Sequence, residues 1–180
     1  MIGVLVSGEG SNLQALLDAG LPVGAVASNV NGAHALERAR TAGVPTAVFA
    51  LDDYADRDAR DAAMADWLVN QGVDLVVCAG YMHLLRPSFL DRFPGRVVNV
   101  HPAPLPAFPG AQPLEDVLAS GADAAAATVH FVDEGVDTGE VIASEPVPVL
   151  PGDTVETLRE RVHAAEHRLL PKVVRELCAR

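Results

Sequence analysis

The stretch Ile2-Gly-Val-Leu-Val6, followed by Ser7-Gly-Glu-Gly-Ser-Asn-Leu13, decides the fold class. Its first five residues form a short apolar run of the kind found in buried parallel strands. The glycines behind this run indicate a tight turn, and Ser11 and Asn12 can cap a helix that ends at Gly20. A buried strand, a turn and a helix in this order begin a βαβ unit, so the sequence predicts an α/β protein.

The same alternation continues over the first hundred residues, where short apolar runs precede longer segments with helical periodicity. We expect strands at 2–6, 23–27, 45–49, 74–79 and 96–100. We expect helices at 12–20, 33–42, 54–71 and 87–93. This order winds a mostly parallel, doubly wound sheet, so the N-terminal half is predicted to be Rossmann-like.

The pattern changes after His101, because four prolines within residues 102–109 exclude regular structure. We expect a loop there rather than a linker to a second domain, so that residues 1–180 form one domain. The later elements are predicted to be a helix at 113–120, antiparallel strands at 126–132 and 140–150, and a last helix to about Cys178. Asp153 and Thr154 can cap that helix, Pro171 is expected to interrupt it, and Pro146 and Pro148 place the preceding strand at the sheet edge.

Composition limits the possible partners. The 180 residues include 24 acidic and 13 basic side chains, a net charge of −11, and Lys172 is the only lysine. Binding of nucleic acid or of an anionic membrane surface is therefore not expected. Cys78 and Cys178 lie a hundred positions apart and are interpreted as free thiols. The N-terminus lacks a basic leader and no apolar run is long enough to span a membrane, so a cytoplasmic location is expected.

The turn at residues 7–13 has two interpretations that the sequence leaves open. Its backbone N–H groups and the following helix N-terminus can hold a phosphate, or it is simply a tight turn. Glu9 opposes anion binding unless its side chain points outward. A dinucleotide site is excluded, because Leu13 replaces the third glycine of that motif and no acidic residue follows the second strand.

Asn99 and His101 are the strongest candidates for catalysis. They stand two apart at the end of a strand, so both side chains project from one face at the carboxyl edge, where open α/β sheets bind ligands. An amide can stabilise an oxyanion and an imidazole can carry a proton or a charge, which together suit acyl transfer. Asp137, in a glycine-flanked turn, can orient His101 and favour its charged form.

A family resemblance rests on several segments that occur in order along residues 2–172. They are Gly8-Glu-Gly-Ser-Asn-Leu13, Ala79-Gly-Tyr-Met82, Asn99-Val-His-Pro102, Leu105-Pro106, Pro109-Gly110, Val129-His-Phe-Val132 and Asp137-Thr-Gly139, with Glu166 near the end. This pattern resembles the phosphoribosylglycinamide formyltransferases. The resemblance implies transfer of a formyl group from 10-formyltetrahydrofolate to the amine of glycinamide ribonucleotide in purine biosynthesis, without a metal.

The resemblance also assigns roles to individual residues. It makes Asn99 the donor to the oxyanion, His101 the group that stabilises or moves charge, and Asp137 the residue that orients His101. The residues implied for glycinamide ribonucleotide are Gly10, Ser11, Asn12 and Leu13 at the phosphate, Glu166 at the ribose, and His163. The residues implied for the reduced folate are Arg57, Met82, His83, Leu84, Leu85, Val132 and Val136. A cis peptide bond at Leu105-Pro106 is implied as well.

Some positions depart from the family pattern. Members usually carry a basic residue at position 83, serine at 103 and a basic residue near 107, where this chain has His83, Ala103 and Ala107. Together with Glu9 in the phosphate turn, these residues alter contacts that the family pattern predicts.

Other functions remain open from the sequence. His163-Ala-Ala-Glu-His167 spells a zinc-binding order, but a solvated or substrate-facing helix stripe is preferred, so no metal is expected. His34 and His167 are expected at the surface and His130 in the core or directly behind the catalytic residues. The alternatives to the transferase are hydrolysis of formyltetrahydrofolate and a non-catalytic ribonucleotide- or folate-binding module. Small molecules are the expected partners, with the chain a monomer or homodimer.

Overall fold

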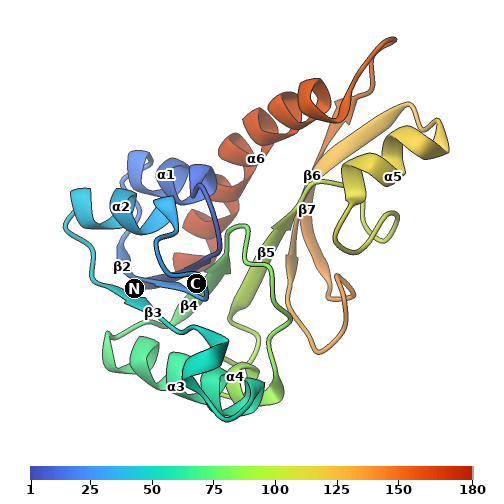
Figure 1. Ribbon diagram of the computed structural model, residues 1–180. Helices are drawn as coiled ribbons and strands as arrows, with labels where there is room; N and C mark the ends of the chain where they lie inside the picture. The colour runs from blue at the N-terminus through green and yellow to red at the C-terminus, as the bar shows by residue number, and fades with distance from the viewer. Residues whose placement is uncertain (180) are drawn as a thin grey trace. The chain divides into compact units, whose positions relative to one another are not determined.

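The central sheet has the strand order β3-β2-β1-β4-β5-β6-β7 (Figure 1). The computed structural model describes residues 1–179. These residues divide into two compact units, one spanning Met1–Val98 and one starting at Asn99. The boundary falls inside β5 (Val97–His101). The mixture of a parallel first half and an antiparallel end confirms the predicted α/β fold class.

The first unit is a parallel sheet with helices on both faces. β1 (Ile2–Val6) pairs in parallel with β2 (Val23–Ser28) and β4 (Leu75–Cys78), and β3 (Thr46–Val48) pairs with β2. Every residue of β1 is buried, as expected for a strand covered on both faces. The helical segments are α1 (Ser11–Asp18), α2 (His34–Thr41), the short 3-10 turn Leu51–Asp53, α3 (Arg57–Asn70) and α4 (Pro87–Leu90).

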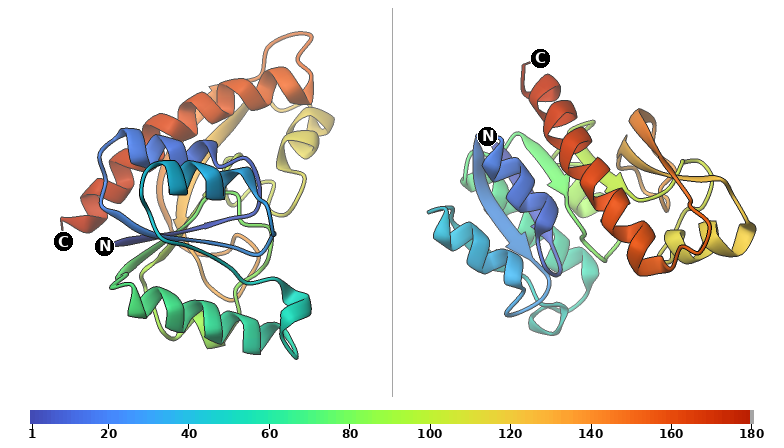
Figure 2. Two further views of the ribbon diagram at one scale, coloured as in Figure 1. Left: turned by 60° about the vertical axis from the view of Figure 1, so that its left-hand side comes forward. Right: turned by 90° about the horizontal axis from the view of Figure 1, so that it is seen from above.

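These helices divide between the two faces of the parallel sheet. In Figures 1 and 2, α1 and α2 lie on one face, and α3 and α4 lie on the other. Apolar side chains of α1 and α3, among them Leu13, Leu16, Met64 and Leu68, are fully buried. This packing leaves the carboxyl ends of β1, β2 and β4 to lead into loops, which is where the candidate binding segments of this unit begin.

The second unit is built on an antiparallel pair. β6 (Ala124–Phe131) pairs with β7 (Val141–Pro148), and β7 is the terminal strand of the sheet order, as its prolines predicted. α6 (Val155–Cys178) packs on both strands, and α5 (Pro113–Ser120) packs on α6 and β6. The long hydrophobic face of α6 therefore supplies much of the core of this unit.

Two details of the helices differ from the sequence predictions. Ser11 and Asn12 do not cap α1, because the N-cap is Gly10 in the left-handed conformation and no side chain caps the helix. Pro171 does not interrupt α6, which continues to Cys178. Its neighbours Leu170 and Val173 are buried, and their packing outweighs the one backbone hydrogen bond that a proline cannot donate.

The structure also tests several smaller predictions about the backbone and the cysteines. The Leu105–Pro106 peptide bond is cis, as the family resemblance implied. Cys78 is buried, Cys178 is exposed, and neither is part of a disulfide bond, as predicted. Burial raises the pKa of the Cys78 thiol to about 12, so this group is inert at neutral pH. Within the described residues, the search for a helix long and apolar enough to cross a membrane finds none.

A capping box fixes the start of α6 and yields a test of the fold. The Thr154 hydroxyl accepts from the Thr157 amide at 3.3 Å, and the Thr157 hydroxyl accepts from the Thr154 amide at 3.0 Å. We expect Thr154→Ala to lower the free energy of unfolding by about 1 kcal/mol, because one helix N–H loses its acceptor. Urea titration followed by circular dichroism measures this change. Thr154→Ser is the matched control, and equal midpoints for the two variants would contradict the capping role.

Candidate active site

Three polar side chains of the second unit converge on the carboxylate of a fourth. Asn99 and His101 come from β5, His130 comes from β6, and Asp137 comes from the connection between β6 and β7. The Asn99 amide nitrogen lies 3.5 Å from Asp137 Oδ1, and His130 Nε2 lies at the same distance from that oxygen. His101 Nδ1 lies 3.5 Å from Asp137 Oδ2. The three residues singled out from the sequence are therefore brought together, with His130 as a fourth.

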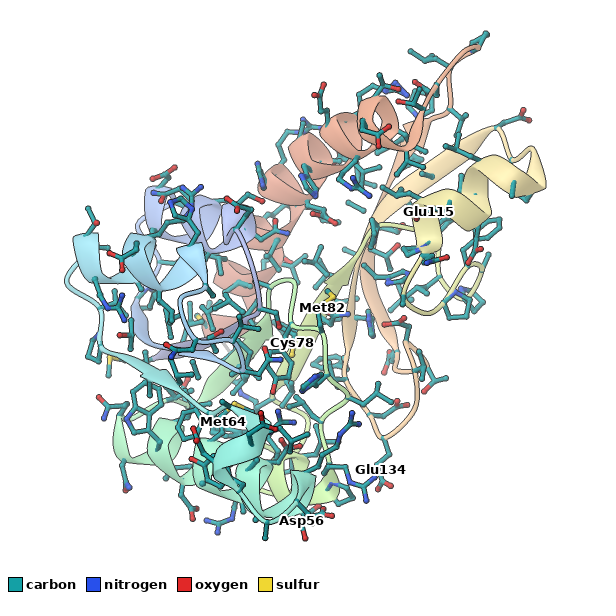
Figure 3. The ribbon with its side chains drawn as sticks, viewed as in Figure 1. Asp56, Met64, Cys78, Met82, Glu115 and Glu134 are labelled. Carbon is teal, nitrogen blue, oxygen red and sulfur yellow. The ribbon has the colours of Figure 1, made fainter. Side chains whose placement is uncertain are left out.

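The turn that carries Asp137 explains its sequence. Asp137 has a left-handed backbone with φ of 53°, a conformation that aspartate tolerates better than most residues. At Gly139 an added Cβ atom would come within 1.8 Å of the Phe131 carbonyl oxygen, so only glycine fits there. The Asp133 carboxylate further braces the turn by accepting from the Gly135 amide and the Thr138 hydroxyl. Glu134, at the tip of this connection, is labelled in Figure 3.

Asp137 is charged at neutral pH. Burial by itself would raise the pKa of this carboxyl group. The hydrogen bond with His130, the 2.9 Å hydrogen bond from the Gly110 amide and the nearby charges of His101 and His130 outweigh burial and hold the pKa of Asp137 below its ordinary value. The Asp137 side chain is only 14% exposed. A charged carboxylate in such a position can orient a positively charged group beside it and compensate its charge.

His101 is placed so that both of its ring nitrogens face oxygen. Its Nε2 donates to the Phe108 carbonyl at 2.8 Å, and its Nδ1 faces Asp137. An imidazolium has a hydrogen on each nitrogen, so two oxygen acceptors suit its charged form. The His101 side chain is only 5% exposed, so the ring is held inside the cluster and away from bulk water.

His130 is the fourth residue of the cluster and is 2% exposed. Its Nδ1 donates to the Phe131 carbonyl at 2.8 Å, so its Nε2 is the nitrogen that faces Asn99 and Asp137. When the ring is neutral, Nε2 accepts from the Asn99 amide at 3.2 Å; when the ring is charged, Nε2 donates toward Asp137. The prediction that His130 lies in the core or behind the catalytic residues is confirmed. Its direct contact with Asn99 was missed, because nothing in the sequence relates these two positions.

The glycine-bearing turn of the first unit, residues 7–13, is the candidate phosphate cradle. At Gly10, where φ is 75°, an added Cβ atom would lie 2.5 Å from the Ala35 Cβ atom, so this position requires glycine. Arg38 donates to the Glu9 carbonyl at 2.8 Å, and the exposed Glu9 side chain pairs with His34 at 3.3 Å. The acidic side chain therefore points outward, and the objection that it raised to anion binding is removed. His34 is exposed, as expected.

The residues implied for ribonucleotide binding differ in their exposure to solvent. Gly10 and Ser11 are partly exposed, whereas Asn12 is 8% exposed. The Leu13 side chain is fully buried in the core, so only its backbone is available to a ligand. Glu166 is 3% exposed on α6, one turn from His163, which is partly exposed.

The histidines of α6 do not form a metal centre. The rings of His163 and His167 stack with centroids 6.1 Å apart, and burial, together with His167 and Arg159, lowers the pKa of His163. In residues 1–179 there is no group of three or more potential ligand side chains that could hold a metal. The expectation that His167 lies at the surface is met in part. It is only partly exposed, and its Nε2 is buried without a hydrogen-bond partner among the described residues, because the helix turns this face toward the core.

The residues implied for folate binding divide between two segments. Met82 and Leu84 are exposed after β4, His83 is partly exposed between them, and Leu85 is buried (Figure 3 labels Met82). Arg57 is exposed at the start of α3. In the second unit, Val136 is 45% exposed and Val132 partly so, and both flank the turn of Asp137. Within the second unit, the exposed Val136 lies one residue before Asp137, and an exposed apolar side chain beside a polar cluster is typical of a ligand-binding surface.

Comparison with known proteins decides the family. A model of the formyl transferase family matches residues 1–174. This chain belongs to the formyl transferase family. Among its relatives, the phosphoribosylglycinamide formyltransferase of Mycobacterium tuberculosis strain H37Rv is 48% identical, and the match covers 97% of this chain and 83% of that protein. A trifunctional purine biosynthetic protein from Chironomus tentans is 44% identical, and the chain spans 13% of its length.

Solved structures of formyl transferases show the same fold. The crystal structure of glycinamide ribonucleotide transformylase 1 from Symbiobacterium toebii matches with a TM-score of 0.95 and 49% identity, over 97% of this chain and 85% of that one. The phosphoribosylglycinamide formyltransferase from Streptococcus pneumoniae matches with a TM-score of 0.94 and 43% identity, over 98% and 97% of the two chains. The family resemblance drawn from the sequence motifs is confirmed.

The lowered pKa of Asp137 predicts how stability depends on pH. Because the folded-state pKa lies below the ordinary value of 3.8, the stabilisation is fully present above that value and is lost as the pH falls through the folded-state pKa. We expect Asp137→Asn to be less stable than wild type near pH 7, and the difference to shrink toward about pH 2. Urea unfolding across this range measures both proteins.

The exposed Asp123→Asn variant serves as the control, because its carboxylate lies away from the histidines in the loop before β6. A difference between wild type and Asp137→Asn that stays constant over the whole pH range would contradict a charged Asp137.

Proposed function

We propose that this chain transfers a formyl group from 10-formyltetrahydrofolate to the amine of glycinamide ribonucleotide, a step of purine biosynthesis. The observation that carries the proposal is the convergence of Asn99, His101 and Asp137 around one point of the second unit. Similarity to phosphoribosylglycinamide formyltransferases over nearly the whole chain supports it. Small molecules are then the partners, and a cytoplasmic location fits a step of nucleotide synthesis.

The chemistry requires charge to be stabilised at one oxygen. The amine nitrogen forms a bond to the formyl carbon, and the formyl oxygen takes up negative charge. The bond from this carbon to the folate nitrogen then breaks, and the proton lost by the amine ends on that nitrogen. An oxyanion in a partly buried site is stabilised most by fixed donors and a nearby positive charge.

The cluster residues can fill these roles. The Asn99 amide has two hydrogens: one is directed at His130 Nε2 at 3.2 Å, and we assign the other, which makes only a long 3.5 Å contact with Asp137, to the oxyanion. The charged form of His101 places a positive ring beside the same point, held by Asp137 and the Phe108 carbonyl. Asp137 acts as a positioning residue that balances this charge. His130 orients the Asn99 amide, since its Nε2 lies 3.2 Å from that group.

The binding roles follow the family resemblance. For glycinamide ribonucleotide we assign the phosphate to the backbone of Gly10, Ser11, Asn12 and Leu13, and the ribose hydroxyls to Glu166 with help from His163. For the reduced folate we assign the segment Met82 to Leu85, Arg57, Val132 and Val136. The altered residues Ala103 and Ala107 provide no polar side chain, so any contact there must use the backbone.

The transferase reaction itself is the first test. We expect formyl transfer to need both substrates, and Asn99→Ala and His101→Ala each to lower kcat by about two to three orders of magnitude, the usual cost of losing an oxyanion donor or an acid–base group. A spectroscopic assay of deformylated folate, run with and without a chelator, measures the rate. Asn70→Ala, at the exposed end of α3, is the control for loss of an amide.

Each alternative predicts a different result in this assay. Release of formate without the ribonucleotide would indicate hydrolysis of formyltetrahydrofolate. Binding of either ligand without turnover would indicate a non-catalytic module. Full activity of both variants with an intact fold would show that the proposed roles are wrong.

The cradle at the first turn can be tested by two glycine substitutions. We expect Gly10→Ala to raise KM for glycinamide ribonucleotide at least about tenfold, because its Cβ atom collides with Ala35 and its backbone is left-handed. KM for the formyl donor should change much less. Gly8→Ala is the matched comparison, since a Cβ atom there meets nothing within 4 Å and its effect should be smaller. Equal effects of the two substitutions on both substrates would argue against a phosphate cradle at Gly10.

A further inference from the structure

A chain of hydrogen bonds in the first unit holds the segment Met82–Arg86 at both ends. The Met82 amide donates to the Ser7 hydroxyl at 2.9 Å, and the Arg86 amide donates to Asp61 Oδ2 at 2.8 Å. Ser7 directly follows the last residue of β1, and Asp61 lies on α3, so groups from two separate elements fix this short loop. The segment is therefore pre-organised without a ligand.

His83, in the middle of the segment, faces two donors with one ring nitrogen. Arg60 Nη1 lies 2.9 Å from His83 Nδ1, and Asn29 Nδ2 lies 3.4 Å from the same atom. The orientation of the Asn29 amide is set independently, because its oxygen accepts from the Ser7 hydroxyl at 2.5 Å. Neither neighbour can accept a hydrogen from Nδ1, so the one N–H of the His83 ring is on Nε2.

Arg60 cannot turn away from this contact or lose its charge. Its side chain is fully buried, and its Nε donates to the fully buried Asp61 at 2.6 Å. A guanidinium stays protonated in proteins, so Arg60 is always a donor. Its Nη2 is buried without a hydrogen-bond partner within residues 1–179, which costs stability. A structure that keeps a costly buried cation beside a partly exposed histidine indicates a functional requirement at that histidine.

The electrostatics agree with the geometry. Burial lowers the pKa of His83 from its ordinary value, and the charges of Arg60 and Arg57 lower it further, while Asp61 opposes them. The other neighbouring group is the Tyr81 ring, which meets the imidazole edge-on with centroids 6.1 Å apart. Burial likewise raises the pKa of the Tyr81 hydroxyl, so this group is neutral. The surroundings of His83 are thus arranged against a second positive charge.

We infer that Arg60 is a positioning residue that keeps His83 neutral and presents its Nε2–H as a fixed hydrogen-bond donor to an acceptor oxygen of the formyl donor. The inference rests on the proposed function, in which Met82 to Leu85 bind the reduced folate. It makes His83 a specificity-determining residue that requires a carbonyl or carboxylate oxygen on the cosubstrate. The donor keeps the same charge across neutral pH, so its contribution to binding does not change there.

The state of the His83 ring can be measured without any substrate. Nitrogen-15 NMR of the whole protein, assigned with His83→Gln, should show His83 neutral with its hydrogen on Nε2 and titrating below the ordinary value of 6.5. Asn29→Asp replaces the facing donor by an acceptor of the same shape, so the pKa of His83 should rise and Nδ1 should gain a hydrogen. Asn70→Asp is the control for adding a negative charge elsewhere. A wild-type His83 with its hydrogen on Nδ1, or one that titrates at or above 6.5, would overturn the inference.

The donor role is tested by two substitutions that resemble different halves of the ring. Gln can place an N–H near the position of Nε2, whereas Asn reaches only to the position of Nδ1. We expect His83→Asn to raise KM for the formyl donor about tenfold, the size expected for one lost hydrogen bond, and His83→Gln to raise it several-fold less, with kcat nearly constant in both. Equal KM values for the two variants would refute the donor role while leaving the transferase function intact. A wild-type protein that transfers no formyl group would instead refute the proposed function, and with it the inference.

Discussion

The candidate active site depends on the carboxylate of Asp137. Its two oxygens receive the Gly110 amide and the Asn99 amide and face the rings of His101 and His130. These groups come from two strands, a proline-rich loop and a hairpin connection, so no single element could assemble them. A neutral side chain of the same size would leave the histidines without a counter-charge. The left-handed backbone at Asp137 and the lack of room for a side chain at Gly139 fix the turn in the conformation that places the Asp137 carboxylate here.

His101, with a proposed catalytic role, and His83, with a proposed role in folate binding, have opposite hydrogen-bonding surroundings. Both ring nitrogens of His101 face oxygen acceptors, whereas Nδ1 of His83 faces amide and guanidinium donors, which disfavour a positive ring. The same side chain type can therefore supply charge in one place and a neutral donor in another. The difference lies entirely in the atoms that face the ring, because both histidines have the same intrinsic acidity.

Sequence periodicity was sufficient for the parallel half of the fold and for the spacing of Asn99 and His101, because buried strands and strand ends have local patterns. Contacts between distant positions had no such signal. Arg60 and Asp61 are adjacent charged residues in a polar stretch of α3, a pattern typical of a solvated helix face, yet both are fully buried. Likewise, Ser11 and Asn12 predicted a side-chain cap for α1, but the N-cap is Gly10. Its left-handed backbone and its close packing against Ala35 both require glycine at this position.

The position of β7 at the end of the strand order has a consequence for association. A terminal strand ordinarily offers a row of unpaired backbone donors to any extended segment that approaches it. In β7 the residues opposite Ala126 and Ala124 are Pro146 and Pro148, and neither has an N–H to offer. Glu145, directly before Pro146, adds a charge that pairs with Arg168. The outer border of the sheet is thus a poor template for pairing with an extended segment of another chain.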